Sequence, residues 1–105
     1  MTDARSWDVP LPSDLPYFEG HFEGDPVLPA VAALQWLALR CAREAWPDLG
    51  APRRLAALKF RRALRPGDTV RVTLSRREQT LDFVLATDGV TAASGRVEFP
   101  PPSRA

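Results

Sequence analysis

The stretch YFEGHFEGDPVLPA, residues 17–30, decides how this chain folds and where its chemistry lies. It holds His21, the only histidine of the protein, in a loop with two glycines and two prolines. Histidine is the side chain whose unperturbed pKa, about 6.5, lets it give and take protons near neutral pH. The stiff loop fixes this ring against the start of the long apolar segment that follows. We therefore predict a site for proton transfer here.

The apolar segment is predicted to form a helix from Pro29 to Ala45 or Trp46. Proline suits the first turn of a helix, where its missing N–H costs nothing, and Pro47 ends the segment. Residues 30–39 are apolar nearly all the way round, whereas a surface helix would show a polar stripe. We expect other parts of the structure to cover this helix on most sides.

After Gly50 the pattern of apolar residues becomes that of strands. We predict strands at 5–9, 54–64, 69–76, around 81–85 and at 90–99, with a turn at 65–68 and a hairpin at Asp88-Gly89. Gly95, inside the last strand, indicates a bulge or a close approach by another backbone. The predicted fold is α+β, with a curved antiparallel sheet wrapped round one helix. So few strands cannot close round a helix and protect their edges, so we expect pairing with a second subunit.

Length and composition fit one domain of 105 residues, with an ordered core over about 5–99 and a proline-rich tail at 100–105. A formal net charge of +1 gives no reason to propose nucleic acid as a partner. The single Cys41 excludes an intramolecular disulfide and, with one histidine, argues against a structural zinc site. No secretory signal or membrane span is visible, so the cytoplasm is the expected location.

Two motifs resemble those of a known family. The pattern F-x-G-H-F-x-G-x-P-x-x-P over residues 18–29 is similar to the active-site loop of hotdog-fold 3-hydroxyacyl-[acyl carrier protein] dehydratases. The pattern L-K-F-x-x-x-L-x-P-G-D over residues 58–68 resembles their strand and turn. Trp36 and the short chain resemble, more narrowly, the small stand-alone dehydratases of aryl polyene and xanthomonadin-like pigment clusters. The resemblance implies a dimeric hotdog fold.

The resemblance also implies the roles of individual residues. His21 takes the place of the base that removes the proton alpha to the thioester. Ala30 takes the place of the glycine whose N–H polarises the thioester carbonyl, and Gly24 and Val31 are implied to bind substrate. The family's carboxylate, on the helix of the other subunit, falls at Gln35. An amide donates and accepts hydrogen bonds but is not a proton acid.

Three functions are therefore considered. In the first, the chain dehydrates a 3-hydroxyacyl thioester to the trans-2-enoyl thioester, with His21 as base, Gln35 holding the geometry and no metal or other cofactor. In the second, it is a non-catalytic or half-catalytic subunit whose partner supplies the carboxylate. The third is an acyl thioesterase. The implied partners are an acyl carrier protein with an acyl-phosphopantetheine thioester, and a second hotdog subunit in a homodimer or a heterodimer.

Other residues have more than one interpretation. Gln35 is either a buried amide bonded to the His21 loop or a group that orients the substrate hydroxyl or water. The apolar side chains of the helix are core, or they line an acyl tunnel: Leu34, Trp36, Leu37, Ala38 and Cys41. Five arginines form either a landing patch for an acidic carrier protein or an ordinary solvated surface: Arg53, Arg54, Arg61, Arg62 and Arg65.

Overall fold

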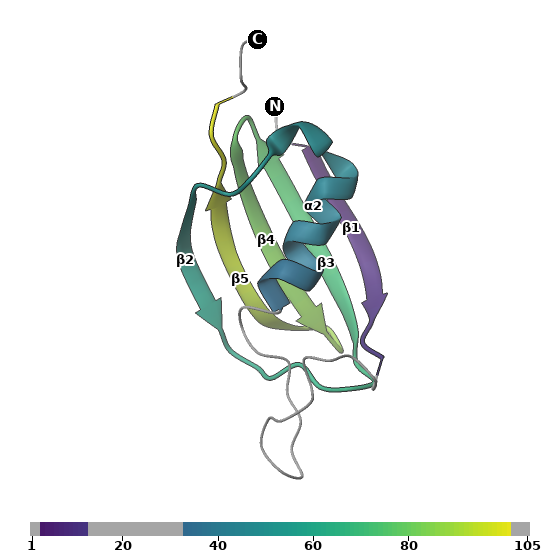
Figure 1. The fold of residues 1–105 in the computed structure, drawn as a ribbon. Coiled ribbons are helices and arrows are strands. Elements are labelled where there is room, and N and C mark those ends of the chain that lie inside the picture. The colour runs from purple at the N-terminus through teal and green to yellow at the C-terminus, as the bar shows by residue number, and fades with distance from the viewer. Residues whose placement is uncertain (1–2, 13–32, 102–105) are drawn as a thin grey trace.

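The computed structural model describes residues 3–12 and 33–101. Five strands form one antiparallel sheet: β1 (Asp3–Pro10), β2 (Arg54–Phe60), β3 (Thr69–Arg77), β4 (Thr80–Thr87) and β5 (Val90–Glu98). The spatial order is β1-β3-β4-β5-β2, so β1 and β2 are the two edge strands. The helix lies along one face of this sheet (Figure 1). The predicted α+β architecture, a sheet curved about one helix, is confirmed.

The helix is continuous from Ala33 but changes its winding along its length. Leu34–Leu39 (η2) is π-helical, Arg40–Ala45 (α2) is α-helical, and a 3-10 turn, Pro47–Leu49 (η3), follows. The predicted end at Ala45 is confirmed, and the predicted start at Pro29 lies outside the described residues. Within the described part of the chain, no helix is long and apolar enough to cross a lipid bilayer.

The core forms between the helix and the three interior strands, β3, β4 and β5. The helix contributes Leu34, Leu37, Ala38, Cys41 and Ala42, and the sheet contributes Val70, Val72, Leu74, Leu81, Phe83, Leu85 and Val97, all of them buried. Along β3 and β4, buried and exposed residues alternate as the sequence pattern predicts. Full burial of one such leucine or valine contributes about 1.5–3 kcal/mol. The sequence-based assignment of the helix leucines to the core is confirmed.

Strand β2 is shorter and less regular than predicted. It ends at Phe60 rather than at residue 64, and its pairing with β5 shifts between Ala56 and Lys59. Ala57 lies in the left-handed backbone region, at φ 54°. The residue opposite this bulge is Gly95, which confirms the irregularity that the glycine indicated. A Cβ at Gly95 would lie 2.5 Å from Cδ2 of Leu58, so the close approach is by a side chain and not by a backbone.

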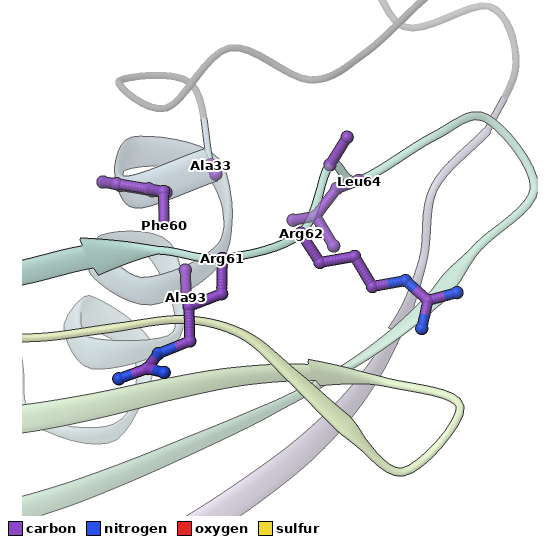
Figure 2. Close-up of a pocket in the computed structure, with 7 residues that line it drawn as sticks. Ala33, Phe60, Arg61, Arg62, Leu64 and Ala93 are labelled. Atoms are coloured by element: carbon purple, nitrogen blue, oxygen red, sulfur yellow. The ribbon is translucent and has the colours of Figure 1, made fainter.

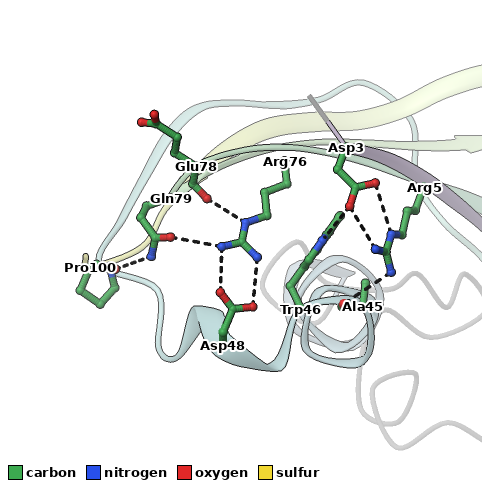
Figure 3. Close-up of polar contacts among 9 residues, drawn as sticks. All are labelled: Asp3, Arg5, Ala45, Trp46, Asp48, Arg76, Glu78, Gln79 and Pro100. Carbon is green, nitrogen blue, oxygen red and sulfur yellow. Dashed lines mark hydrogen bonds and ion pairs between the residues drawn. The ribbon is translucent and has the colours of Figure 1, made fainter. Parts of the chain in front are cut away.

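The C-terminal end of the helix is held by hydrogen bonds to β1. The indole Nε1 of Trp46 donates to Oδ2 of Asp3 at 3.1 Å. Arg5 pairs with the same carboxylate at 3.0 Å and donates to the carbonyl of Ala45 at 3.4 Å (Figure 3). The Arg5 and Trp46 hydrogen bonds hold the pKa of the Asp3 carboxyl below its usual range. The helix therefore cannot shift along the sheet without breaking bonds to the edge strand.

A second set of contacts holds the 3-10 turn that follows. Arg76 forms a two-pronged pair with Asp48, at 3.1 and 2.9 Å, and also donates to Gln79 (Figure 3). Gln79 in turn donates to the carbonyl of Pro100 at 2.6 Å. The Arg76 hydrogen bonds lower the pKa of Asp48 and raise that of Arg76. The Arg76 guanidinium thus links the turn after the helix, through Gln79, to Pro100, which follows the end of the last strand.

We expect Gly95→Ala to destabilise the fold, because the new methyl would also lie 2.7 Å from the ring of Phe83. Overpacking of this kind costs about 1–3 kcal/mol, measurable as a lower free energy of unfolding in urea. Ser94→Ala, next along β5, is the matched control and should change that free energy by less than about 0.5 kcal/mol. Adding Leu58→Ala to Gly95→Ala should recover part of the loss. Full stability of the single variant would contradict the observed packing.

We expect the pair between Arg76 and Asp48 to make stability depend on pH. The folded-state pKa of Asp48 is lowered from 3.8, so its contribution is present above that pH and is lost as pH falls through the folded value. Asp48→Asn should lower the melting temperature at pH 7, and its difference from wild type should disappear in strong acid. Glu44→Gln, at an exposed acid with no ion pair among the described residues, is the control. An equal difference at every pH would contradict this role.

Candidate active site

The predicted site residues divide into two groups. His21, Gly24, Ala30 and Val31 lie outside the described residues, so their positions stay predictions. Gln35 is described, and it lies in the first turn of the π-helical segment η2. Single π-helical turns occur often at functional sites, because they shift side chains out of α-helical register. The π-helical segment and the predicted site therefore coincide at Gln35.

Gln35 is exposed, and the sheet of its own chain does not cover it. It borders two hollows, one with Trp36, Arg40 and Arg43, the other with residues that include Leu39 and Leu55. In the first, the guanidinium of Arg40 lies 4.3 Å from the centre of the Trp36 ring. The single chain therefore leaves Gln35 exposed, and its hydrogen bond to the His21 loop stays a prediction, because that loop lies outside the described residues. The sheet covers one side of the described helix.

Among the described residues, the ionisable side chains that line these two hollows are all arginines. Arg40 and Arg43 line one hollow, and Arg53 and Arg54 line the other. Arginine stays protonated in proteins, so none of these four can pass a proton to a substrate. A proton acid at Gln35 must come from outside the described residues of this chain. The arginines instead provide positive charge, which attracts an anionic group.

A further pocket lies where the described part of the helix begins. Its volume is about 290 Å³, and it is lined by Ala33, Phe60, Arg61, Arg62, Ala63, Leu64 and Ala93. Figure 2 shows Phe60 near Ala33 at the helix start, with the guanidinium of Arg62 pointing away from them. The pocket has an apolar inner wall and a cationic rim, which suits an apolar group that continues into an anionic one.

Backbone hydrogen bonds form the wall of this pocket. The N–H groups of Arg61 and Arg62 both donate to the carbonyl of Ala92, at 2.7 and 3.2 Å. The chain therefore leaves β2 with both arginine side chains exposed, while Leu64 turns back into the core. This is the segment that resembles the strand and turn of the dehydratases. The motif thus forms one side of a pocket at the helix start.

The five arginines of the predicted patch do not form one group. Arg53 and Arg54 lie at the start of β2, and Arg61 and Arg62 follow its end. Six residues of strand, 55–60, at roughly 3.3 Å each separate the two pairs. Arg65 lies further along, where its backbone N–H donates to Oδ2 of Asp68. All five are exposed, and positive charge extends along the whole β2 edge.

Cys41 belongs to the core and not to the site. It is buried, and desolvation raises the pKa of its thiol. A reactive cysteine requires a lowered pKa and access to solvent. Among the described residues, no group of three or more His, Cys, Asp or Glu side chains could hold a metal ion.

Sequence reasoning did not place two of these residues at the site. The sequence analysis gave Phe60 no role beyond its place in the motif at residues 58–68, but Phe60 lines the pocket at the helix start. Arg40 stacks on Trp36, and the spacing of four residues on a helix could have indicated that pair. The position of Phe60 follows the bulge in β2, which no pattern within β2 itself indicates.

The family model and the individual relatives that match this chain are all dehydratases. Residues 2–96 match the ApeI-like family, ApeI dehydratase. A 3-hydroxyacyl-[acyl-carrier-protein] dehydratase FabZ of Acetivibrio thermocellus is 35% identical over 95 residues, covering 80% of this chain and 65% of that protein. The FabZ of Oenococcus oeni is 37% identical over 97 residues, covering 79% and 68%. The alignment with the first of these thus spans slightly less than two thirds of the relative.

Two solved structures are similar over nearly the whole chain. An uncharacterized protein from Erwinia carotovora subsp. atroseptica superposes with a TM-score of 0.84 at 30% identity, covering 95% of this chain and 85% of that one. The dehydratase heterocomplex ApeI:P from Xenorhabdus doucetiae superposes with a TM-score of 0.82 at 25% identity, covering 93% and 92%. These neighbours confirm the hotdog fold. The chain belongs to the ApeI-like dehydratase family.

Proposed function

We propose that this chain dehydrates a 3-hydroxyacyl thioester to the trans-2-enoyl thioester, at a site shared with a second hotdog subunit. The observation that carries the reaction is the family match over residues 2–96. That match favours dehydration over thioester hydrolysis. The exposure of Gln35, on a helix face that its own sheet leaves open, supports the sharing of the site. The proposed substrate carrier is an acyl carrier protein, as in the names of the FabZ relatives.

In the proposed mechanism, His21 removes the proton alpha to the thioester carbonyl. The electron pair of that C–H bond forms the Cα=Cβ double bond as the bond to the beta-hydroxyl breaks. The hydroxyl takes up a proton and leaves as water. The backbone N–H of Ala30 stabilises the developing charge on the thioester oxygen. Gly24 and Val31 contact the acyl thioester, and Gln35 holds the beta-hydroxyl by a hydrogen bond.

The source of the proton for the leaving hydroxyl separates two versions of this proposal. In one, the protonated His21 passes it on, and one kind of chain is enough. In the other, this chain is half-catalytic and an unlike hotdog subunit supplies a carboxylate. The second version is favoured by the described ionisable residues that line the hollows at Gln35, all of which are arginines. The Xenorhabdus doucetiae neighbour is by name a heterocomplex.

We expect His21→Ala to abolish turnover. The purified chain is mixed with a 3-hydroxyacyl carrier-protein thioester, and formation of the enoyl thioester is followed by mass spectrometry. Loss of a general base typically costs 10²–10⁴-fold. Ser94→Ala, on β5 and away from the site, is the control and should retain full activity. Measurable turnover that is equal in His21→Ala and in wild type would overturn the proposed base.

We expect Gln35→Glu to raise the turnover of the chain on its own by roughly 10²-fold, because it restores a proton acid on the helix. Gln35→Ala, which removes both the amide and the acid, is the matched control and should not gain activity. Activity that appears only in Gln35→Glu supports the half-catalytic version. Wild-type turnover that depends on His21 supports a single kind of chain. A Gln35→Glu variant no faster than wild type would contradict the assignment of position 35.

A further inference from the structure

One of the two hollows beside Gln35 has walls of apolar side chains. Its volume is about 300 Å³, and the residues that line it are Leu34, Gln35, Leu39, Pro52, Arg53, Arg54 and Leu55. The other hollow is lined by Trp36, Arg40 and Arg43, with no aliphatic residue among the described ones. A hydrocarbon chain that starts at Gln35 is therefore better accommodated in the first hollow, where it lies against aliphatic side chains.

The π-helical winding forms one wall of this hollow. Hydrogen bonds in such a segment join residues five apart, so each turn takes more residues than an α-helical turn. The backbone N–H of Arg40 donates to the carbonyl of Gln35 in this way. Leu34 and Leu39, which are also five apart, therefore lie on the same side of the helix. Both line the hollow and form an apolar wall beside Gln35.

The start of strand β2 forms the opposite wall. Leu55 is 42% exposed, and its cross-strand partner Val97 is buried, so Leu55 turns toward the helix side of the sheet. Pro52, just before the strand, is half-buried. Ligand-binding hollows are typically lined by apolar side chains with a few polar groups that fix the orientation of the ligand. The apolar part of this description is met by the two walls.

The two arginines of this hollow differ in their surroundings. Successive side chains of a strand point to opposite faces, so Arg54 points away from the side on which Leu55 lies. Its guanidinium pairs with Glu98 at 3.6 Å. Arg53 is exposed, and no carboxylate in the described part of the chain forms an ion pair with it. Arg53 is therefore the cation at this hollow that is placed to bind an anion of a ligand.

We propose that this hollow holds the acyl chain of the substrate and that Arg53 binds a carboxylate at the far end of that chain. The substrate class is then the 3-hydroxyacyl thioesters of dicarboxylic acids. The inference rests on the proposed function, because it places the reacting carbons at Gln35. The apolar walls contact the methylene groups, and a guanidinium binds a carboxylate through paired hydrogen bonds.

The test measures binding of pantetheine thioesters that lack the beta-hydroxyl and so cannot be dehydrated. Adipoyl, suberoyl and sebacoyl thioesters, which end in a carboxylate, are compared with hexanoyl, octanoyl and decanoyl thioesters, which end in a methyl group. Isothermal titration calorimetry of the purified chain at low salt should show the best carboxylate-ended ligand binding at least about 10-fold more tightly than the methyl-ended ligand of equal length, as for a hydrogen bond to a charged group. High salt should reduce this preference, because salt screens exposed charges.

Two neighbouring arginines provide matched variants. Arg53→Gln should abolish the preference for the carboxylate and leave binding of the methyl-ended ligands unchanged. Arg54→Gln, on the other face of the strand, should keep the preference. Arg53→Lys should restore part of it, because the charge returns without the planar pair of donors. Leu55→Ser should weaken both kinds of ligand alike, because they share that wall. Circular dichroism confirms that each variant is folded.

Equal binding of the two kinds of ligand by wild type at every length would overturn the proposal. A preference that survives in Arg53→Gln would overturn it too, and so would an equal loss of both kinds of ligand in that variant, which would mean that Arg53 holds the pantetheine instead. Absence of binding by every ligand would contradict the hollow as the acyl site.

None of these measurements requires turnover, so their outcome is separate from that of the His21 and Gln35 experiments. A chain without turnover that still prefers the carboxylate would leave this inference intact. Dehydration that depends on His21, with no preference for the carboxylate, would refute the inference and retain the proposed function.

Discussion

Burial of one side of the helix against β3 and β4 is the contact on which the rest of the structure depends. Leu37 and Ala38 are completely buried there, and Cys41 lies beside them. The sheet has only five strands, so it covers this side and leaves Gln35 in the open. The uncovered face of the helix and the uncovered edge at β2 are two results of the same shortage of strands.

The electrostatics of these open surfaces are unusual for a site of proton transfer. Within residues 3–12 and 33–101, the charged side chains that line the hollows at Gln35 and the pocket at the helix start are arginines. Such a surface holds anions well but cannot give up a proton at neutral pH. The chemistry of the site is therefore divided between a neutral imidazole, supplied by the chain's own loop in the proposed mechanism, and an acid that the described residues do not provide. This division makes the identity of the second subunit a question of mechanism as well as of assembly.

Much of the fold could be predicted from local patterns. Alternation of apolar residues located β3 and β4, and Pro47 located the end of the helix, because these signals depend on near neighbours in the chain. The π-helical winding at Gln35 and the bulge at Ala57 were not predicted, since they depend on packing between distant segments. The glycine at position 95 was the one local sign of that bulge. The sequence also did not show that Gln35 is exposed in the single chain, because an apolar sequence indicates that a helix face is buried but not which chain buries it.

The hydrogen-bonded cluster round Arg76 also bears on how the chain could be reconnected. Asp3 is linked to Arg76 through Trp46, and Pro100 through Gln79, so segments near the two ends of the chain meet at the same end of the sheet (Figure 1). Chains whose ends lie close together tolerate circular permutation. A peptide bridging these ends, with new termini opened at the exposed Asp88-Gly89 turn, would preserve every strand of the sheet. The same proximity makes this architecture suited to tandem duplication, in which two such units are encoded as one polypeptide.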